Sequence, residues 1–210
     1  MHARKTTIKG SPDQVDRAKE VIESKVIPGV REMPGFKGGY WLFDRETGDA
    51  VSFTFFDTKD SLGASSEAAN RLRGSASGEM GASITGVDEY EVGADTGATV
   101  HRGASHARVL HFDGDPANAD AAVTMIEERV IPGVRAFPGF VGGFWLIDRE
   151  AGKGVGVTLY DSAENLKASR APADTMRTQS AGQLGGTFGE FKEYEVLART
   201  EAPERVGAGG

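Results

Sequence analysis

The 210-residue chain contains no cysteine, which excludes disulfides, thiolate metal sites and a cysteine nucleophile. Basic residues are outnumbered, because 24 Lys and Arg stand against 31 Asp and Glu and the net charge is −7. A general nucleic-acid binder needs concentrated positive charge to neutralise phosphates. The charge balance therefore argues against nucleic acid as a partner.

Long apolar runs and histidine clusters are also missing. No apolar run reaches the roughly 20 residues of a membrane span, and no apolar segment follows the basic N-terminus as in a secretory signal. We therefore expect a cytoplasmic protein with no membrane partner. The four histidines, at positions 2, 101, 106 and 111, lack metal-ligand spacing. We accordingly expect no metal and no cofactor.

An internal duplication dominates the chain. The stretch VIPGVREMPGFKGGYWLFDRETG (26–48) recurs as VIPGVRAFPGFVGGFWLIDREAG (130–152), with 17 of 23 positions identical and an offset of 130 − 26 = 104. Such a repeat predicts two homologous units, and units of about 100 residues gain buried surface by packing together. The expected organisation is a first repeat at 1–97, a linker at 98–106, a second repeat at 107–200 and a disordered tail at 201–210.

Both units show the same order of predicted elements. In the first unit these are a strand at 4–9, a helix opened by Ser-Pro-Asp-Gln at 11–14, a hairpin of strands at 36–45 and 50–56, a helix at 57–73, a Gly- and Ser-rich loop at 74–86 and a strand at 87–92. Pro28 is expected to end the first helix, and Pro172 to break or bend the second helix of the second unit. The order is βαββαβ, that of a ferredoxin-like unit.

The βαββαβ order, the PGFxGG entry to the second strand, the aromatic-Trp-Leu triplet and the acidic turn together resemble the dimeric α+β barrel superfamily, in particular its antibiotic-biosynthesis-monooxygenase-like branch. The resemblance covers 4–197, once per unit. It implies an α+β fold in which two ferredoxin-like units close one barrel within a single chain, with helices outside and a ligand cavity within. It says less about the reaction, since one fold serves many functions.

Haem degradation, one activity of that superfamily, is disfavoured. The haem-degrading branch has an Asn on the first strand and a His on the second helix. The first strands here carry Thr6, Thr7, His111 and Asp113, and neither second helix contains His.

Alternation along the third strands separates two faces. Val51, Phe53 and Phe55, matched by Val155, Val157 and Leu159, are expected to meet the helices. The other face is expected to line the barrel cavity, with Gly156 opposite Ser52 leaving extra space. The alternative is that these side chains simply fill a packed core. Substrate-binding candidates on this face are Thr54, Phe56, Thr158 and Tyr160.

Aromatic pairs at matched positions of the second strands complete the candidate substrate-binding residues: Tyr40 with Trp41, and Phe144 with Trp145. Core packing is the alternative for these four. His111 is the candidate catalytic base, because its counterpart in the first repeat is Thr7 and a neutral imidazole can take a proton from a phenol or quinol. A hydrogen-bonded strand histidine without catalytic role is the alternative.

Two functions remain open. One is a cofactor-independent, monooxygenase-like enzyme acting on a small aromatic or quinol-type substrate in the barrel. The other is a non-catalytic small-molecule-binding or stress-associated protein of the same fold. In either case the expected partner is a small hydrophobic or aromatic molecule, and the chain is a monomeric pseudo-dimer whose further self-association is left open.

Overall fold

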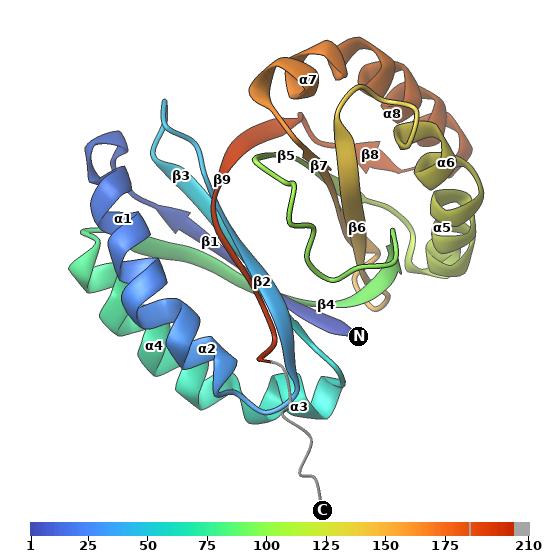
Figure 1. Ribbon diagram of the computed structural model, residues 1–210. Coiled ribbons are helices and arrows are strands. Elements are labelled where there is room, and N and C mark those ends of the chain that lie inside the picture. The colour runs from blue at the N-terminus through green and yellow to red at the C-terminus, as the bar shows by residue number, and fades with distance from the viewer. Residues whose placement is uncertain (185, 204–210) are drawn as a thin grey trace, which may run out of the picture.

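The computed structural model describes residues 1–184 and 186–203 and has an α+β fold (Figure 1). The first repeat contains β1 (His2–Lys9), η1 (Pro12–Gln14), α1 (Val15–Val21), the π-helix η2 (Ile22–Val26), α2 (Ile27–Arg31), β2 (Phe36–Phe43), β3 (Asp49–Phe56), α3 (Lys59–Ala64), α4 (Ser66–Glu79) and β4 (Ser83–Asp95). The second contains β5 (His106–Asp113), η3 (Pro116–Asn118), α5 (Ala119–Met125), the π-helix η4 (Ile126–Val130), α6 (Ile131–Val134), β6 (Phe140–Asp148), β7 (Lys153–Tyr160), α7 (Ala163–Ala168), α8 (Arg170–Leu184), β8 (Thr187–Phe188) and β9 (Lys192–Glu201). The predicted βαββαβ order is confirmed in both repeats.

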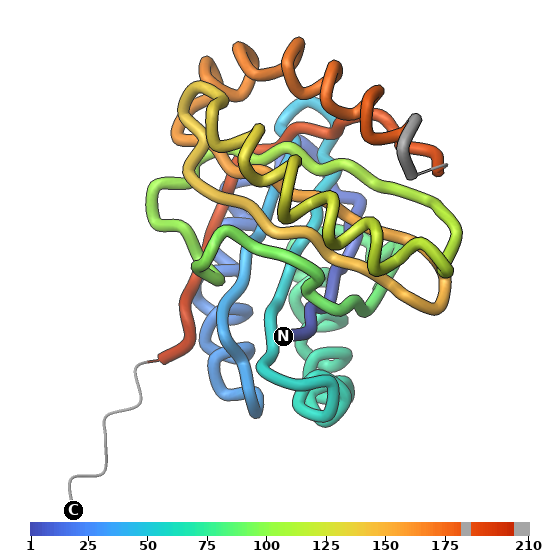
Figure 2. The backbone as a smooth tube through the Cα atoms, turned by 90° about the vertical axis from the view of Figure 1, so that its right-hand side faces the viewer, coloured from blue at the N-terminus to red at the C-terminus, as the bar shows by residue number. Residues whose placement is uncertain are grey.

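The strands close into a barrel because the last strand of each repeat pairs with the first strand of its own repeat and with the second strand of the other. The described strands follow the order β7-β6-β4-β1-β3-β2-β9-β5, and β5 pairs with β7 to complete the ring, while β8 adds to the end of β5. Thus β4 pairs with β6 and β9 pairs with β2. Each repeat therefore contributes four consecutive strands to the ring, β4-β1-β3-β2 and β9-β5-β7-β6. Figure 2 shows the backbone turned by 90° from Figure 1, with the helices of the second repeat in front of and above the strands. The expected intramolecular barrel is confirmed.

Packed side chains fill the barrel interior. A single buried cluster joins both repeats and, among the described residues, takes no member from a helix; it includes Val51, Phe53, Phe55, Val155, Val157 and Leu159. Phe144 lies at its centre, with its ring centroid 5.2 Å from that of Phe53 and 4.9 Å from that of Phe55. The expectation that this strand face meets the helices is therefore wrong, and so is the expectation of a ligand cavity inside the barrel.

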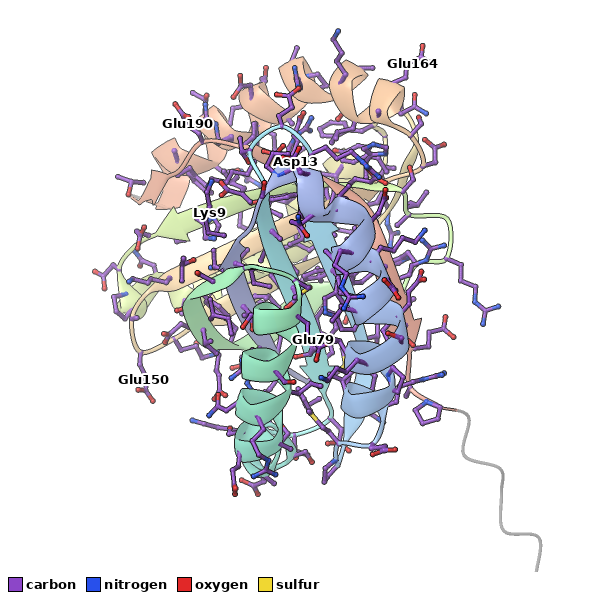
Figure 3. The ribbon with its side chains drawn as sticks, turned by 90° about the vertical axis from the view of Figure 1, so that its left-hand side faces the viewer. Lys9, Asp13, Glu79, Glu150, Glu164 and Glu190 are labelled. Atoms are coloured by element: carbon purple, nitrogen blue, oxygen red, sulfur yellow. The ribbon has the colours of Figure 1, made fainter. Side chains whose placement is uncertain are left out.

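The opposite strand face is covered by helices in both repeats. In the first repeat, α1 and α4 run side by side across the sheet (Figure 3), and their apolar side chains pack on Trp41, Phe43 and Phe56. Lys25 of η2 and Glu79 of α4 form an ion pair between the two helices. No helix of the described chain is long and apolar enough to cross a membrane.

The first helix of each repeat continues past its proline, contrary to expectation. The π-turn Ile22–Val26 precedes Pro28, and the N–H of Ile27 bonds to the carbonyl of Ile22, five residues back. A widened turn relieves the clash that the ring of a proline makes with the preceding turn, so α2 runs on to Arg31.

The second helices also differ from the predicted bounds. The predicted loop at 74–86 is wrong, since α4 extends to Glu79 and β4 begins at Ser83. The helix does break, but at Ser169 and not at Pro172, because α7 ends at Ala168 and α8 runs from Arg170 through Pro172 in its first turn. In the first repeat the helix breaks at the equivalent Ser65, where no proline follows. A feature shared by both repeats therefore causes the break.

The segment expected to be a linker packs against the barrel. Val100 and Ala104 belong to the barrel cluster, and the backbone N–H of His101 donates to Tyr40 Oη at 2.6 Å. Of the expected tail, Glu201 still belongs to β9, and residues 204–210 lie outside the described residues.

Candidate functional site

The repeats each hold a pocket between the sheet and the helices. The first-repeat pocket lies under α1, η2 and α4, has a volume of about 90 Å³, and is lined by β1, β2 and β3 on the sheet side. The second-repeat pocket lies under α5, η4 and α8 with a volume of about 120 Å³. Both are mainly apolar, and no carboxylate side chain is among their lining residues.

A tryptophan forms part of the sheet-side wall of each pocket. Trp41 lies in the first-repeat pocket and Trp145 in the second, each almost fully buried. Each indole packs over a glycine two residues earlier, because a Cβ at Gly39 or Gly143 would lie 3.1 Å from the tryptophan ring. This close approach explains the second glycine of the repeated GG-aromatic-Trp motif.

The indole of Trp145 fills the space beside Gly156. Gly156 pairs with Trp145 in the β-hairpin, and a Cβ at this position would lie 3.0 Å from the indole Nε1. The expectation that Gly156 leaves extra room for a ligand is therefore wrong.

The predicted hydroxyl-bearing face does line the pockets. Ser52 and Thr54 face the first-repeat pocket, and Thr158 and Tyr160 face the second. Phe56 is fully buried against Phe36 in the helix layer of the first repeat, with ring centroids 6.1 Å apart. Strand alternation therefore grouped these residues correctly but assigned them to the wrong side of the sheet.

Tyr40 and Phe144 lie on the other side of the sheet from the two tryptophans. Their rings stack inside the barrel with centroids 5.8 Å apart, which makes them core residues. Burial raises the pKa of Tyr40 to about 12.

His111 also lies away from both pockets. It follows Ala107 and Val109 on the inward face of β5, whereas the alternate residues Arg108 and Leu110 line the second-repeat pocket. Burial, and then the positive charges of Lys5 and Lys192, lower the pKa of His111. The structure thus does not bring His111 together with the pocket hydroxyls or either tryptophan.

Two buried arginines, missed at the sequence level, join the pockets to the helix breaks. Arg108 is 2% exposed, and its guanidinium donates to the Leu166 carbonyl at 2.7 Å, to Ser169 Oγ at 2.9 Å and to Glu193 at 2.8 Å. Arg4 makes the equivalent bonds to Leu62, Ser65 and Glu89. Binding of the last carbonyls of α3 and α7 by these arginines explains why both helices break at the same place. The sequence could have indicated this cluster, because the arginine, leucine, serine and glutamate that form it are identical in the two repeats at the offset of 104.

No protein-family model matches the chain. An uncharacterized protein of Mycobacterium tuberculosis is 26% identical over 209 residues, which cover 98% of this chain and 92% of that protein. The similarity thus spans nearly the whole of both chains, and the name of this relative carries no activity.

Solved structures share the fold at low sequence identity. A "putative monooxygenase" from Lactobacillus acidophilus superposes with a TM-score of 0.65 at 10% identity, covering 96% of each chain. An "anthrone oxidase-like protein" gives a TM-score of 0.65 at 17% identity over 99% of this chain and 96% of that one. A heme-binding protein from Thermus thermophilus gives 0.58 at 11% identity over 92% and 90%. The chain therefore shares the fold of these proteins, an α+β barrel built from two ferredoxin-like units.

Haem does not fit the pockets. No histidine, the usual axial ligand of haem iron, lines either one. An apolar cavity of about 150 Å³ holds benzene. Both pockets are smaller than this, so haem would require the helices to move off the sheet.

Proposed function

We propose that this chain, a fused barrel of the monooxygenase-like fold, binds a small aromatic or hydrophobic molecule between the sheet and the helices of each repeat. One observation carries the proposal: the duplication places a tryptophan and a threonine on the wall of both apolar pockets, Trp41 with Thr54 and Trp145 with Thr158. A flat indole and a hydroxyl beside an apolar wall suit a planar ligand with one polar group.

The size of the pockets supports a ligand with one ring inside. Their volumes of about 90 and 120 Å³ are smaller than the roughly 150 Å³ of an apolar cavity that takes up benzene. Small movements of methionine side chains would supply the difference, since Met33 and Met80 line the first-repeat pocket and methionine adapts its shape easily.

Cofactor-independent oxygenation of the bound molecule is the second candidate. It is supported by the names of two proteins of the same fold, a "putative monooxygenase" and an "anthrone oxidase-like protein". In this candidate the ionised substrate donates the electrons to oxygen, and His111 is the proposed base. Since His111 lines neither pocket, the substrate would lose its proton to His111 outside the pockets in this candidate.

Ligand binding is testable because the chain has only two tryptophans, one in each pocket. In Trp145→Phe only Trp41 reports, and in Trp41→Phe only Trp145 reports. We expect 4-nitrotoluene, a neutral one-ring quencher, to reduce the fluorescence of both variants saturably. Linear quenching in both, as for a quencher that only collides, would contradict the proposal.

The same variants, in an oxygen electrode with one- and two-ring hydroquinones, separate the two candidates. Saturable quenching without oxygen uptake assigns a binding protein. Oxygen uptake that His111→Ala abolishes assigns the oxygenase with His111 as base, and uptake undiminished in His111→Ala removes that role.

A further inference from the structure

The two pockets differ in charge at one matched pair of arginines. Arg73 of α4 lines the first-repeat pocket, and its counterpart Arg177 of α8 lines the second. Three residues before each arginine the repeats diverge, with Asn70 in the first and Asp174 in the second. One helical turn brings these side chains together, so the divergence changes the partner of the arginine.

Arg177 pairs with a carboxylate of its own helix, Asp174, whose side chain is 59% exposed. Its Nη2 donates to Asp174 Oδ1 at 2.8 Å and its Nη1 to the Gly189 carbonyl at 3.1 Å. The guanidinium also lies over the Phe191 ring, 5.2 Å from the centroid. A ligand of this pocket therefore meets an arginine that already has a carboxylate and an aromatic partner.

Arg73 has no such carboxylate. Its guanidinium donates to the side-chain oxygen of Asn70, and no described carboxylate lies within ion-pair distance of it. Burial and then the charge of Arg4 lower the pKa of Arg73, which still remains charged at neutral pH because arginine does not deprotonate in proteins. A half-buried cation without a counterion is unfavourable, and an anion in the pocket would relieve this.

Other charges near the pockets do not remove the contrast. Glu89 is the partner of Arg4, at 2.9 Å. In the second repeat Glu193 pairs with Arg108 and with Arg170, whose side chain is 59% exposed and therefore screened by solvent. The charge that differs inside the pockets is thus the one at Arg73.

We infer that the first-repeat pocket takes a small aromatic or apolar molecule bearing a carboxylate or similar single negative charge, which Arg73 binds, whereas the second-repeat pocket takes a neutral molecule. This inference rests on the proposed binding function. A guanidinium binds a carboxylate through two parallel N–H···O bonds, which gives orientation as well as affinity. The rings of the ligand would then lie toward Trp41, beneath η2 and α4.

A reciprocal exchange of the two diverged residues tests the inference. The probes are 4-nitrobenzoate and its neutral analogue 4-nitrobenzamide, followed by quenching of the single tryptophan. In Trp145→Phe we expect the benzoate to bind Trp41's pocket about tenfold more tightly than the benzamide, the size of one charged hydrogen bond. Adding Asn70→Asp should bring the ratio close to one, and so should adding Arg73→Gln.

The second repeat provides the matched gain of function. In Trp41→Phe we expect no preference for the benzoate, and adding Asp174→Asn should create one of about tenfold. Both exchanged positions are exposed on helices, so the variants are expected to fold, as circular dichroism would verify.

The outcomes separate the inference from the function on which it rests. Equal affinity of the two probes for the Trp41 pocket would overturn the inference while leaving ligand binding intact. An anion preference unchanged by Asn70→Asp would overturn the role of Arg73. Absence of saturable quenching by either probe would contradict both the inference and the proposed function.

Discussion

Replacing Arg108 with alanine is expected to lower the free energy of unfolding by about 3–5 kcal/mol, as when one partner of a buried ion pair is removed. The substitution leaves Glu193, which is 18% exposed, without its buried partner. It also removes the donors to Ser169 Oγ and to the Leu166 carbonyl at the end of α7. The loss is measured by urea unfolding of wild type and variant.

Arg170→Ala is the matched control, because Arg170 pairs with the same carboxylate from the surface. Its side chain is 59% exposed, and exposed pairs contribute about 1 kcal/mol or less. Glu193 keeps Arg108 in this variant. Burial would raise the pKa of Glu193, yet hydrogen bonds from Arg170 and Arg108 lower it, and Arg108 alone remains buried beside it. Equal losses in the two variants would mean that Arg108 does not hold the helix break.

Phe144→Ala is also expected to lower the free energy of unfolding by about 3–5 kcal/mol, because the substitution opens a large cavity in a well-packed core. Its side chain is 3% exposed and contacts Tyr40, Phe53 and Phe55 from the other repeat. These contacts cross the interior of the barrel. The variant therefore weakens the joint between the two repeats, which thermal and urea unfolding would detect.

Phe112→Ala is the control for the loss of an aromatic ring outside the barrel. Phe112 is half-buried beside Phe188 in the second-repeat pocket, and a partly buried ring contributes about 1–2 kcal/mol. A loss at Phe144 no larger than this would indicate that the barrel interior is loosely packed.

The fold could be predicted because the duplication repeats every local signal. The same apolar spacing, turns and strand patterns occur at an offset of 104, so two weak assignments support each other. The length of α4 could not be predicted, since Gly74 and Gly78 are unfavourable in helices. Its last turns are held by tertiary contacts, namely the packing of Ala76 and the ion pair between Lys25 and Glu79.

The side of the sheet that faces the barrel could not be predicted. Both faces of β3 are covered, because one packs in the barrel and the other under helices, so alternation separates the faces without orienting them. Val51, Phe53 and Phe55 are as hydrophobic as a helix-covered face would be. Strand alternation therefore recognised Thr54, Phe56, Thr158 and Tyr160 as one face, but the sequence-based prediction placed that face inside the barrel and not under the helices.

The proposed difference in ligand charge rests on a difference between the repeats, although not at the position first chosen. His111, which stands against Thr7, lines neither pocket. Asn70 against Asp174 changes the partner of a pocket arginine, and only the structure shows that this arginine lines a pocket.

The central claim is that ligands bind between the sheet and the helices and that the barrel itself is closed. Xenon tests this directly, since it enters apolar cavities in protein crystals without needing a specific ligand. Crystals under xenon pressure should show xenon density beside Trp41 and beside Trp145, in the pockets under α4 and α8. Xenon among Tyr40, Phe53 and Phe144, with none beside the tryptophans, would contradict the account.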